Sequence, residues 1–125
     1  MFRVYISGPI TAPTLEREVE NVNMALEAAY QLVSVGLAVY LPHAFWFADR
    51  HMARRGHPPI KNGYLSQDIE WVKAVEAVLR LPGVSIGAEC EVAFARTCGI
   101  PIYDCVSNVI KAAPSNAHFQ GECNG

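Results

Sequence analysis

Short apolar runs alternate with segments of helical period along most of the chain, and this alternation constrains the fold more than any other feature. Strands are predicted at residues 3–7, 37–41, 77–81 and 100–105, where Val, Ile, Leu and Tyr gather in short runs. Helices are predicted between these strands. A strand–helix–strand order of this kind is typical of a parallel sheet with helices on both faces.

The predicted helices carry apolar residues at three- and four-residue steps. The longest covers residues 15–33, and Gly36 just beyond it is a typical helix stop. Ser66 is predicted to cap the next helix, and residues 87–98 and 106–112 form two more. The expected fold class is therefore α/β: a three-layer, flavodoxin- or Rossmann-like parallel sheet of four to five strands with helices on both faces.

A single domain is expected over residues 1–112. A flexible tail is expected over residues 113–125, where the composition turns polar and small. Residues 43–63 interrupt the alternation, because they lack a clear period apart from a short helix predicted near residues 44–54. A segment of this length is often a lid or a binding insertion.

The composition excludes several classes of protein. The 125 residues are 51% apolar and 18% charged, which is too apolar for extended disorder. Ten basic and twelve acidic residues give a net charge of -2, so neither a nucleic acid polymer nor an anionic membrane is an expected partner. No apolar run approaches the roughly 20 residues of a membrane span. No secretory signal is visible, and a cytoplasmic location is expected.

The cysteines match neither a metal site nor a disulfide framework. Cys90, Cys98, Cys105 and Cys123 show no C-x-x-C spacing, and no histidine stands at zinc-finger distance from them. We expect small buried hydrophobes in a reducing compartment. The sequence predicts neither a metal nor a cofactor.

Candidate functional residues follow the third predicted strand. Ligands of parallel sheets bind beyond the carboxyl ends of the strands. Ser85 and Gly87 open a helix there, and its free backbone N–H groups together with the serine hydroxyl can hold a phosphate. A simple helix cap is the alternative. Glu91 follows one turn later, where the helix dipole keeps a carboxylate ionised, as a nucleophile requires.

Asp68 stands near the start of the preceding helix and could meet Glu91 at the same edge of the sheet. Two neighbouring carboxylates push their pKa values apart, so that one holds a proton while the other is charged. Such a pair suits cleavage of a glycosidic bond through an oxocarbenium-like state. Tyr5, near the end of the first strand, could hydrogen-bond the nucleophile. Both residues also have structural explanations, as a helix-dipole partner (Asp68) and as a core aromatic (Tyr5).

Three segments, in order along the chain, carry a family resemblance. They are Val4-Tyr5-Ile6-Ser7-Gly8-Pro9-Ile10, Gln67-Asp68-Ile69-Glu70-Trp71-Val72 and Ser85-x-Gly87-x-x-x-Glu91. Together they resemble the nucleoside 2-deoxyribosyltransferase-like superfamily. Within it, the 2'-deoxynucleoside 5'-monophosphate N-hydrolases are the most similar, since their His-containing turn resembles Pro42-His43-Ala44 and their C-terminal segment resembles residues 106–110 and 119–120.

The resemblance implies a role for each matching residue. Glu91 would attack the anomeric carbon, Asp68 would protonate the leaving base, and Tyr5 would orient Glu91. The residues implied for substrate binding are Ser7, Gly8, Ile10, His43, Ser85, Gly87 and Ser107. Of these, Ser85 and Gly87 would hold the 5'-phosphate, helped by Ser107 from a neighbouring subunit. A homodimer or higher homo-oligomer with a shared active site is therefore expected.

This sequence departs from the hydrolases at two points. They carry an arginine just after the opening segment, whereas residues 11–13 here are Thr-Ala-Pro. Arg50, Arg54 or Arg55 could supply the missing charge. The aromatic residues 45–47 have no counterpart, and they could either stack on a base or belong to the core.

The expected function is an N-glycosidase. It would hydrolyse a nucleoside or deoxynucleoside 5'-monophosphate to free base and sugar phosphate through a covalent glycosyl–Glu91 intermediate. One alternative is a nucleoside 2'-deoxyribosyltransferase, in which a second base replaces water. Another is a protein that binds or sequesters nucleotides without turning them over.

Overall fold

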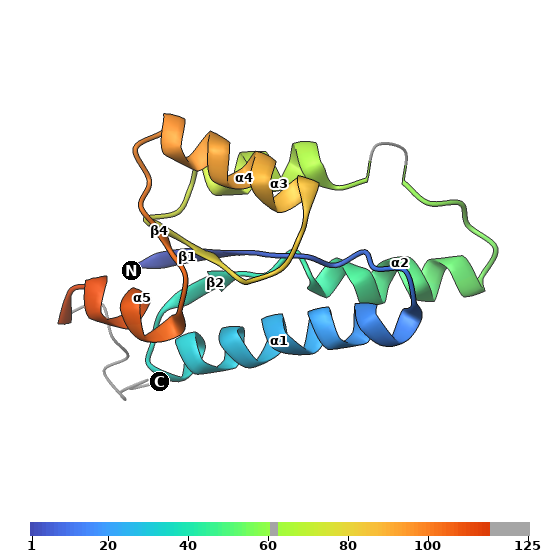
Figure 1. The fold of residues 1–125 in the computed structure, drawn as a ribbon, viewed down its shortest axis with the longest axis horizontal. Coiled ribbons are helices and arrows are strands. Elements are labelled where there is room, and N and C mark those ends of the chain that lie inside the picture. The colour runs from blue at the N-terminus through green and yellow to red at the C-terminus, as the bar shows by residue number, and fades with distance from the viewer. Residues whose placement is uncertain (61–62, 116–125) are drawn as a thin grey trace, which may run out of the picture.

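Four parallel strands form a sheet between two layers of helices (Figure 1). The computed structural model describes residues 1–60 and 63–115. The strands are β1 (Arg3–Ser7), β2 (Ala38–Tyr40), β3 (Ala77–Arg80) and β4 (Ile102–Tyr103). The helices are α1 (Leu15–Ser34), α2 (Ala44–Arg54), α3 (Leu65–Val72), α4 (Ile86–Thr97) and α5 (Val106–Ala112). The predicted α/β fold class is confirmed.

The strand order, β2-β1-β3-β4, determines where a site can form. β1 pairs with β2 along one edge and with β3 along the other, so the chain reverses its direction across the sheet at β1. Open parallel sheets bind ligands outside the carboxyl ends of their strands at such a switch point. Ser7 and Arg80 are paired in register at this end of β1 and β3.

The two faces of the sheet form separate apolar cores. Val4 and Ile6 of β1 pack with residues of α1 and α5, whereas Tyr5 packs with residues of α3 and α4. Figure 1 shows α1 and α5 on one side of the sheet and α3 and α4 on the other. Because side chains alternate along a strand, Ser7 lies on the same face as Tyr5. A polar end of β1 is thereby buried beside α4.

The residue 43–63 segment contains the helix predicted within it. α2 has no buried residue, and it extends beyond the carboxyl end of the sheet (Figure 1). The Ser66 cap prediction is wrong, because α3 already begins at Leu65, after Tyr64. β4 is shorter than predicted, since only Ile102–Tyr103 find partners on β3. Whether the tail is flexible stays a prediction, since residues 116–125 lie outside the described part.

The cysteine prediction is wrong for three of the four positions. Cys90, Cys98 and Cys105 are exposed free thiols. Cys90 lies on the outer side of α4, and the other two lie at helix ends, where the chain meets solvent. Cys123, like Phe119 and Gln120 of the resembling C-terminal segment, is outside the described residues. Within residues 1–60 and 63–115, no helix has both the length and the apolar character to span a bilayer.

The turn between β3 and α4 depends on glycine at position 83. Gly83 has φ +118°, and a Cβ atom there would lie 2.8 Å from Cγ of Pro9. We expect Gly83→Ala to lower the free energy of unfolding by about 2–4 kcal/mol, since a strained backbone and a steric clash add. Gly99→Ala is the matched control, because its φ is +72° and nothing lies within 4 Å. Urea unfolding of both variants would contradict the prediction if they lost equal stability.

Candidate active site

Glu91 is a buried carboxylate held by two hydroxyl groups of β1. It lies in the second turn of α4 and is 6% exposed. Tyr5 Oη donates to its Oε2 over 2.7 Å, and Ser7 Oγ donates to its Oε1 over 2.6 Å. Tyr5 and Ser7 share a face because they are two residues apart in a strand. Both oxygens of the carboxylate are therefore fixed in direction by the sheet.

Asp68 is the second buried carboxylate, and it comes from α3. It is 7% exposed, and Tyr40 Oη donates to its Oδ1 over a long 3.4 Å. Tyr40 itself accepts a hydrogen bond from Gln67 Nε2 over 3.1 Å. Its ring stacks between those of Tyr5 and Trp71, with centroids 5.4 and 5.1 Å away. Tyr5, which donates to Glu91, is therefore stacked on Tyr40, which donates to Asp68.

The two carboxylates have unlike protonation behaviour. Burial raises the pKa of Glu91, but the hydroxyls of Ser7 and Tyr5 stabilise its charged form and oppose the rise. Burial, and then the charge of Glu91, raises the pKa of Asp68 to about 7. Burial and the same charge raise the pKa of Tyr5 far above its usual range, so its hydroxyl remains a donor. Near neutral pH the pair thus has one better-stabilised carboxylate and one carboxyl group able to carry a proton.

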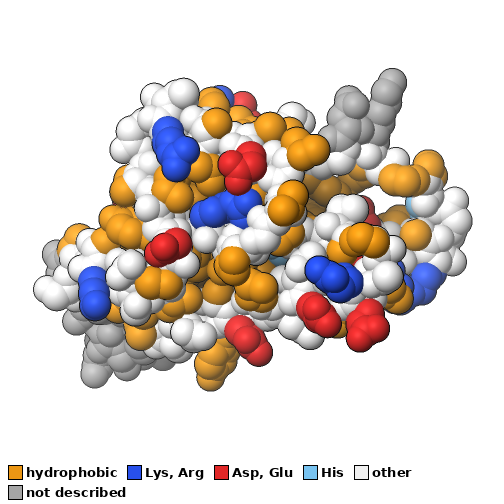
Figure 2. Space-filling view, in the orientation of Figure 1, with side chains coloured by type: hydrophobic (Ala, Val, Ile, Leu, Met, Phe, Trp, Pro, Cys, Tyr) orange, Lys and Arg blue, Asp and Glu red, His pale blue; other side chains and the backbone are white. Residues whose placement is uncertain are grey.

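Both carboxylates line an open cavity of about 1290 Å³ at the carboxyl end of the sheet. Figure 2 shows the molecule hollowed at the end that carries α2, with charges of both signs scattered over this face. The other predicted site residues that line the cavity are Gly8, Ile10, His43, Ser85 and Gly87. The cavity is partly open to solvent.

The N-terminus of α4 forms part of the cavity wall. Ser85 has an extended backbone, and its Oγ accepts a hydrogen bond from the N–H of Ala88 over 3.1 Å. The serine is therefore a helix cap, as the alternative interpretation has it. The wall remains open to a ligand at Gly87, because a Cβ atom there would meet nothing nearer than Ser85 Oγ at 4.0 Å. The first N–H groups of a helix lack partners within it and are suited to bind an anion.

A comparison with models of known protein families identifies the family to which the chain belongs. A family model described as a domain of unknown function (DUF4406) matches residues 2–104. The chain belongs to the DUF4406 family. No curated protein matches it at a significant level.

One solved structure that this DUF4406 chain resembles is the 2-deoxyribosyltransferase from the psychrotolerant bacterium Bacillus psychrosaccharolyticus. The TM-score is 0.56 and the sequence identity 14%, over 92% of this chain and 95% of the other. At this identity the likeness shows a shared fold. It agrees with the predicted flavodoxin-like arrangement.

Two of the predicted substrate-binding residues lie away from the cavity wall. Ser7 is fully buried, and its hydroxyl is directed to Glu91 instead of lining the pocket. Ser107 lies in the first turn of α5, where its Oγ is 3.3 Å from Sγ of Cys105. Neither residue is among those that line the cavity within the described chain. The role assigned to Ser107 required a second subunit, and it stays a prediction.

His43 is the least satisfied polar group of the site. It is fully buried at the start of α2, and neither ring nitrogen has a hydrogen-bond partner within the described chain. Burial lowers the pKa of His43 to about 4, although the backbone of Pro9 and Gly8 beside the ring opposes this. The backbone groups lie close without reaching hydrogen-bond geometry. The imidazole is therefore neutral at pH 7, with one donor and one acceptor unused.

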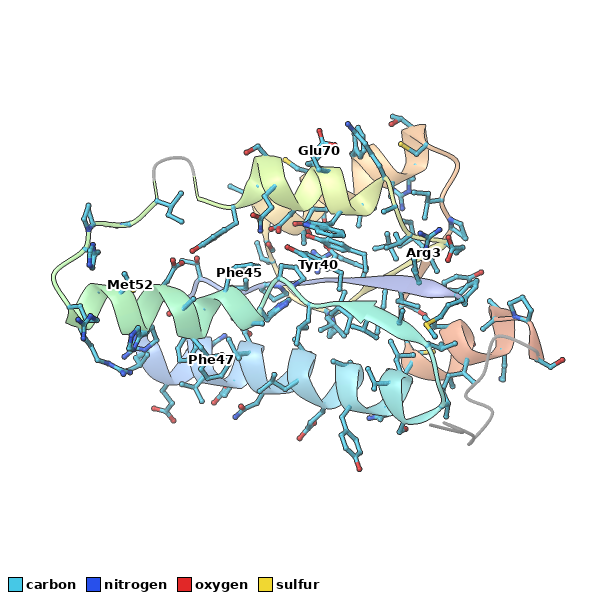
Figure 3. All side chains as sticks on the ribbon, turned by 180° about the vertical axis from the view of Figure 1, so that it is seen from behind. Arg3, Tyr40, Phe45, Phe47, Met52 and Glu70 are labelled. Carbon is cyan, nitrogen blue, oxygen red and sulfur yellow. The ribbon has the colours of Figure 1, made fainter. Side chains whose placement is uncertain are left out.

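The wall opposite α4 is built by α2. Phe45 stacks on Tyr64 at 4.9 Å, and Trp46 Nε1 donates to Glu18 of α1 over 3.0 Å. Arg50 lies over the Trp46 ring at 4.9 Å. Phe45 and Trp46 thus line the cavity while already in contact with other side chains, Phe45 stacked on Tyr64 and Trp46 beneath Arg50. Phe47 lies on the α1 side of α2 (Figure 3). Arg50 is the arginine of this segment that lines the cavity; Arg54 and Arg55 are not among its lining residues.

Sequence reasoning missed three contributors to the site: the hydroxyl of Ser7 as a partner of Glu91, Tyr40 as a partner of Asp68, and Glu18 as the anchor of Trp46. A signal existed for Tyr40, since it ends the second strand next to Tyr5. Glu18 gave no signal, because a glutamate in the first turn of a helix is ordinarily a solvated residue. Among the described residues, no group of three or more His, Cys, Asp or Glu is placed to hold a metal ion.

The hydrogen bond from Tyr5 can be tested directly. We expect Tyr5→Phe to raise the pKa of Glu91 by about one to two units, because a hydrogen bond to a charged group contributes about 1.5–3 kcal/mol. Carboxyl-detected NMR titration of labelled glutamate measures the shift. Tyr30→Phe is the control, since Tyr30 is exposed on α1. An unchanged pKa in Tyr5→Phe would mean that this hydroxyl does not stabilise the carboxylate.

Proposed function

We propose that this protein cleaves the N-glycosidic bond of a nucleoside 5'-monophosphate, giving free base and sugar phosphate. The observation that carries the proposal is the pair of buried carboxylates, Glu91 and Asp68, which line one cavity in unlike environments. Glycosidic bond cleavage uses such a pair, with one ionised group and one protonated group. The shared fold with a 2-deoxyribosyltransferase supports a nucleoside-type sugar as the substrate.

The chemistry follows from the roles of the two groups. An oxygen of Glu91 forms a bond to C1' as the bond from C1' to the base nitrogen breaks. The electron pair of that bond stays with the base, and Asp68 delivers a proton to it, since an anionic base leaves poorly. Water then attacks C1', gives a proton to Asp68 and releases the Glu91 carboxylate. Two displacements at one carbon retain its configuration.

The 5'-phosphate is assigned to the N-terminus of α4. The open space at Gly87 and the helix dipole support this assignment. Arg50 is a second source of positive charge on the opposite wall. Ser107 would add its hydroxyl from a second copy of the chain, which makes the active form a homo-oligomer. Light scattering, together with the KM of Ser107→Ala for the monophosphate, tests that part separately.

A transferase is the second candidate. The structural neighbour is a 2-deoxyribosyltransferase, and the same glycosyl–Glu91 ester would be opened by a second base instead of water. The large open cavity has room for an incoming base. Supplying a free base together with the substrate separates the two, because only a transferase would form a new nucleoside or nucleotide.

The decisive experiment is a release assay on a panel of ribo- and deoxyribonucleosides and their 5'-monophosphates. Free base is detected by liquid chromatography with mass spectrometry, and the intact protein is weighed for a glycosyl adduct. Release from monophosphates with a transient adduct on Glu91 supports the proposal. Binding without release from any compound would contradict it and favour nucleotide sequestration.

A further inference from the structure

Arg80 joins the end of β3 to the first turn of α4. Its guanidinium donates to the carbonyl of Leu81 and, through Nη2, to the carbonyl of Gly83 over 2.9 Å. The same Nη2 lies 2.9 Å from Oε1 of Glu89, near the start of α4. The side chain is 17% exposed, although the glutamate is 70% exposed. One planar group therefore spans the whole β3–α4 turn.

We propose that Arg80 is a positioning residue, which fixes the β3–α4 turn and keeps a positive charge near Glu91. The inference rests on the proposed function, because it assigns Arg80 to the support of the nucleophile. Arg80 is not among the residues that line the cavity, so it acts through its neighbours and not on the substrate.

The backbone around Arg80 is hydrogen-bonded to Ser7, the residue that donates to Glu91. Arg80 is paired in register with Ser7, and the carbonyl of Ser7 accepts a hydrogen bond from the N–H of Leu81 over 2.7 Å. The hydroxyl of Ser7 in turn holds Glu91. At its other end the guanidinium reaches Glu89, two residues before Glu91 in the same helix. Movement of this side chain would therefore shift both the strand end and the helix that fix the carboxylate.

Several groups besides Arg80 affect the pKa of Glu91. Tyr5 from β1, Tyr40 from β2 and Asp68 from α3 face the carboxylate region, and Glu89 lies on the same helix as Glu91. Burial, and then the charge of Glu91, raises the pKa of Asp68. Burial also raises the pKa of Glu91, and the charge of Arg80 opposes this rise in addition to the hydroxyls of Ser7 and Tyr5. A positive charge that never reaches the substrate can thus keep the nucleophile ionised.

The test compares Arg80→Met, Arg80→Gln and Arg80→Lys with Arg3→Met. Arg3 is the matched control, because it also makes an ion pair, over 2.7 Å with Glu76, but lies at the opposite end of the sheet from Phe45 and Met52 (Figure 3). The measurements are the pH dependence of kcat/KM for the cleaved substrate and the NMR-detected pKa of Glu91. Thermal unfolding checks that each variant is folded.

We expect Arg80→Met and Arg80→Gln to move the acidic limb of kcat/KM, and the pKa of Glu91, upward by about half a unit to one unit. Arg80→Lys keeps the charge, so the limb returns to the wild-type position. Its kcat still falls about tenfold, because one ammonium cannot span two carbonyls and a carboxylate as a planar guanidinium does. Arg3→Met should lower the unfolding temperature without moving the acidic limb of kcat/KM.

Two results would overturn the inference. One is an unchanged pKa of Glu91 in the folded Arg80→Gln variant, and the other is a shift in Arg80→Lys as large as that in Arg80→Gln. If the wild type cleaves no compound of the panel, the proposed function fails on its own. The NMR titration then still decides whether Arg80 stabilises the ionised form of Glu91, because it needs no substrate.

Discussion

Glu91→Gln is expected to reduce base release by about 1,000-fold or more, which corresponds to a loss of about 4 kcal/mol of transition-state stabilisation. The amide has nearly the size of the carboxylate and can still accept a hydrogen bond from Tyr5 or Ser7. It is a poor nucleophile and carries no charge to stabilise an oxocarbenium-like centre. Initial rates of base release measure the loss, and the covalent adduct should disappear with it.

The matched control for this variant is Glu89→Gln. Glu89 lies in the same helix, two residues earlier, but it is exposed and pairs with Arg80. Because Glu89 is one of the contacts of Arg80, this variant should lose at most the roughly tenfold expected of Arg80→Lys, far less than Glu91→Gln. Equal losses in the two variants would point to a general effect of charge at the start of α4. Unchanged release in a folded Glu91→Gln variant would remove this residue from the mechanism, and with it the proposed function.

The fold class could be predicted from the sequence because it follows from short apolar runs and helical periods, each visible within a few residues. Apolar runs near residues 3–7 and 77–81 could be recognised singly, and their alternation with helices implied the parallel sheet. The shortness of β4 was not visible, because it depends on how far β3 offers partners. The start of α3 at Leu65 was also missed, since serine is a common cap and Tyr64 is not.

The site was predicted in part for the same reason. Tyr5 lies near the carboxyl end of β1, and Asp68 in the first turn of α3 and Glu91 in the second turn of α4 lie at the same edge of the sheet, so their meeting follows from topology. What the sequence could not give was the hydrogen-bond partner of each oxygen. Ser7 looked like a pocket residue, yet strand alternation turns it toward Glu91. The contacts of Trp46 with Glu18 and of Arg80 with the turn depend on side-chain packing, which no short pattern encodes.

Asp68→Asn is expected to slow base release by about 100- to 1,000-fold, within the usual contribution of a general acid. The loss should depend on the leaving group, because an amide at this position cannot protonate the base. A glycoside whose leaving group is stable as an anion, such as p-nitrophenolate, should lose far less. Glu70→Gln is the control on the same helix, since Glu70 points outward from α3 (Figure 3) and pairs with Lys73. An equal loss for good and poor leaving groups would contradict the role of Asp68 as a proton donor.

The same variant should be more stable than the wild type at high pH. The pKa of Asp68 is about 7 in the folded protein and 3.8 in its unperturbed state, so between these values the folded state binds more protons than the unfolded state. Stability from this group is therefore present below about pH 4, decreases as the pH rises towards 7, and is absent above it. The amide of the variant has no proton to lose, and above pH 7 the variant should gain up to a few kcal/mol relative to the wild type, at about 1.36 kcal/mol per pKa unit. Urea unfolding of both proteins from pH 4 to 8 measures this difference, in which the titration of other carboxylates largely cancels. A difference independent of pH would show that the charge of Asp68 does not destabilise the folded state, and the acid role would lose its physical basis.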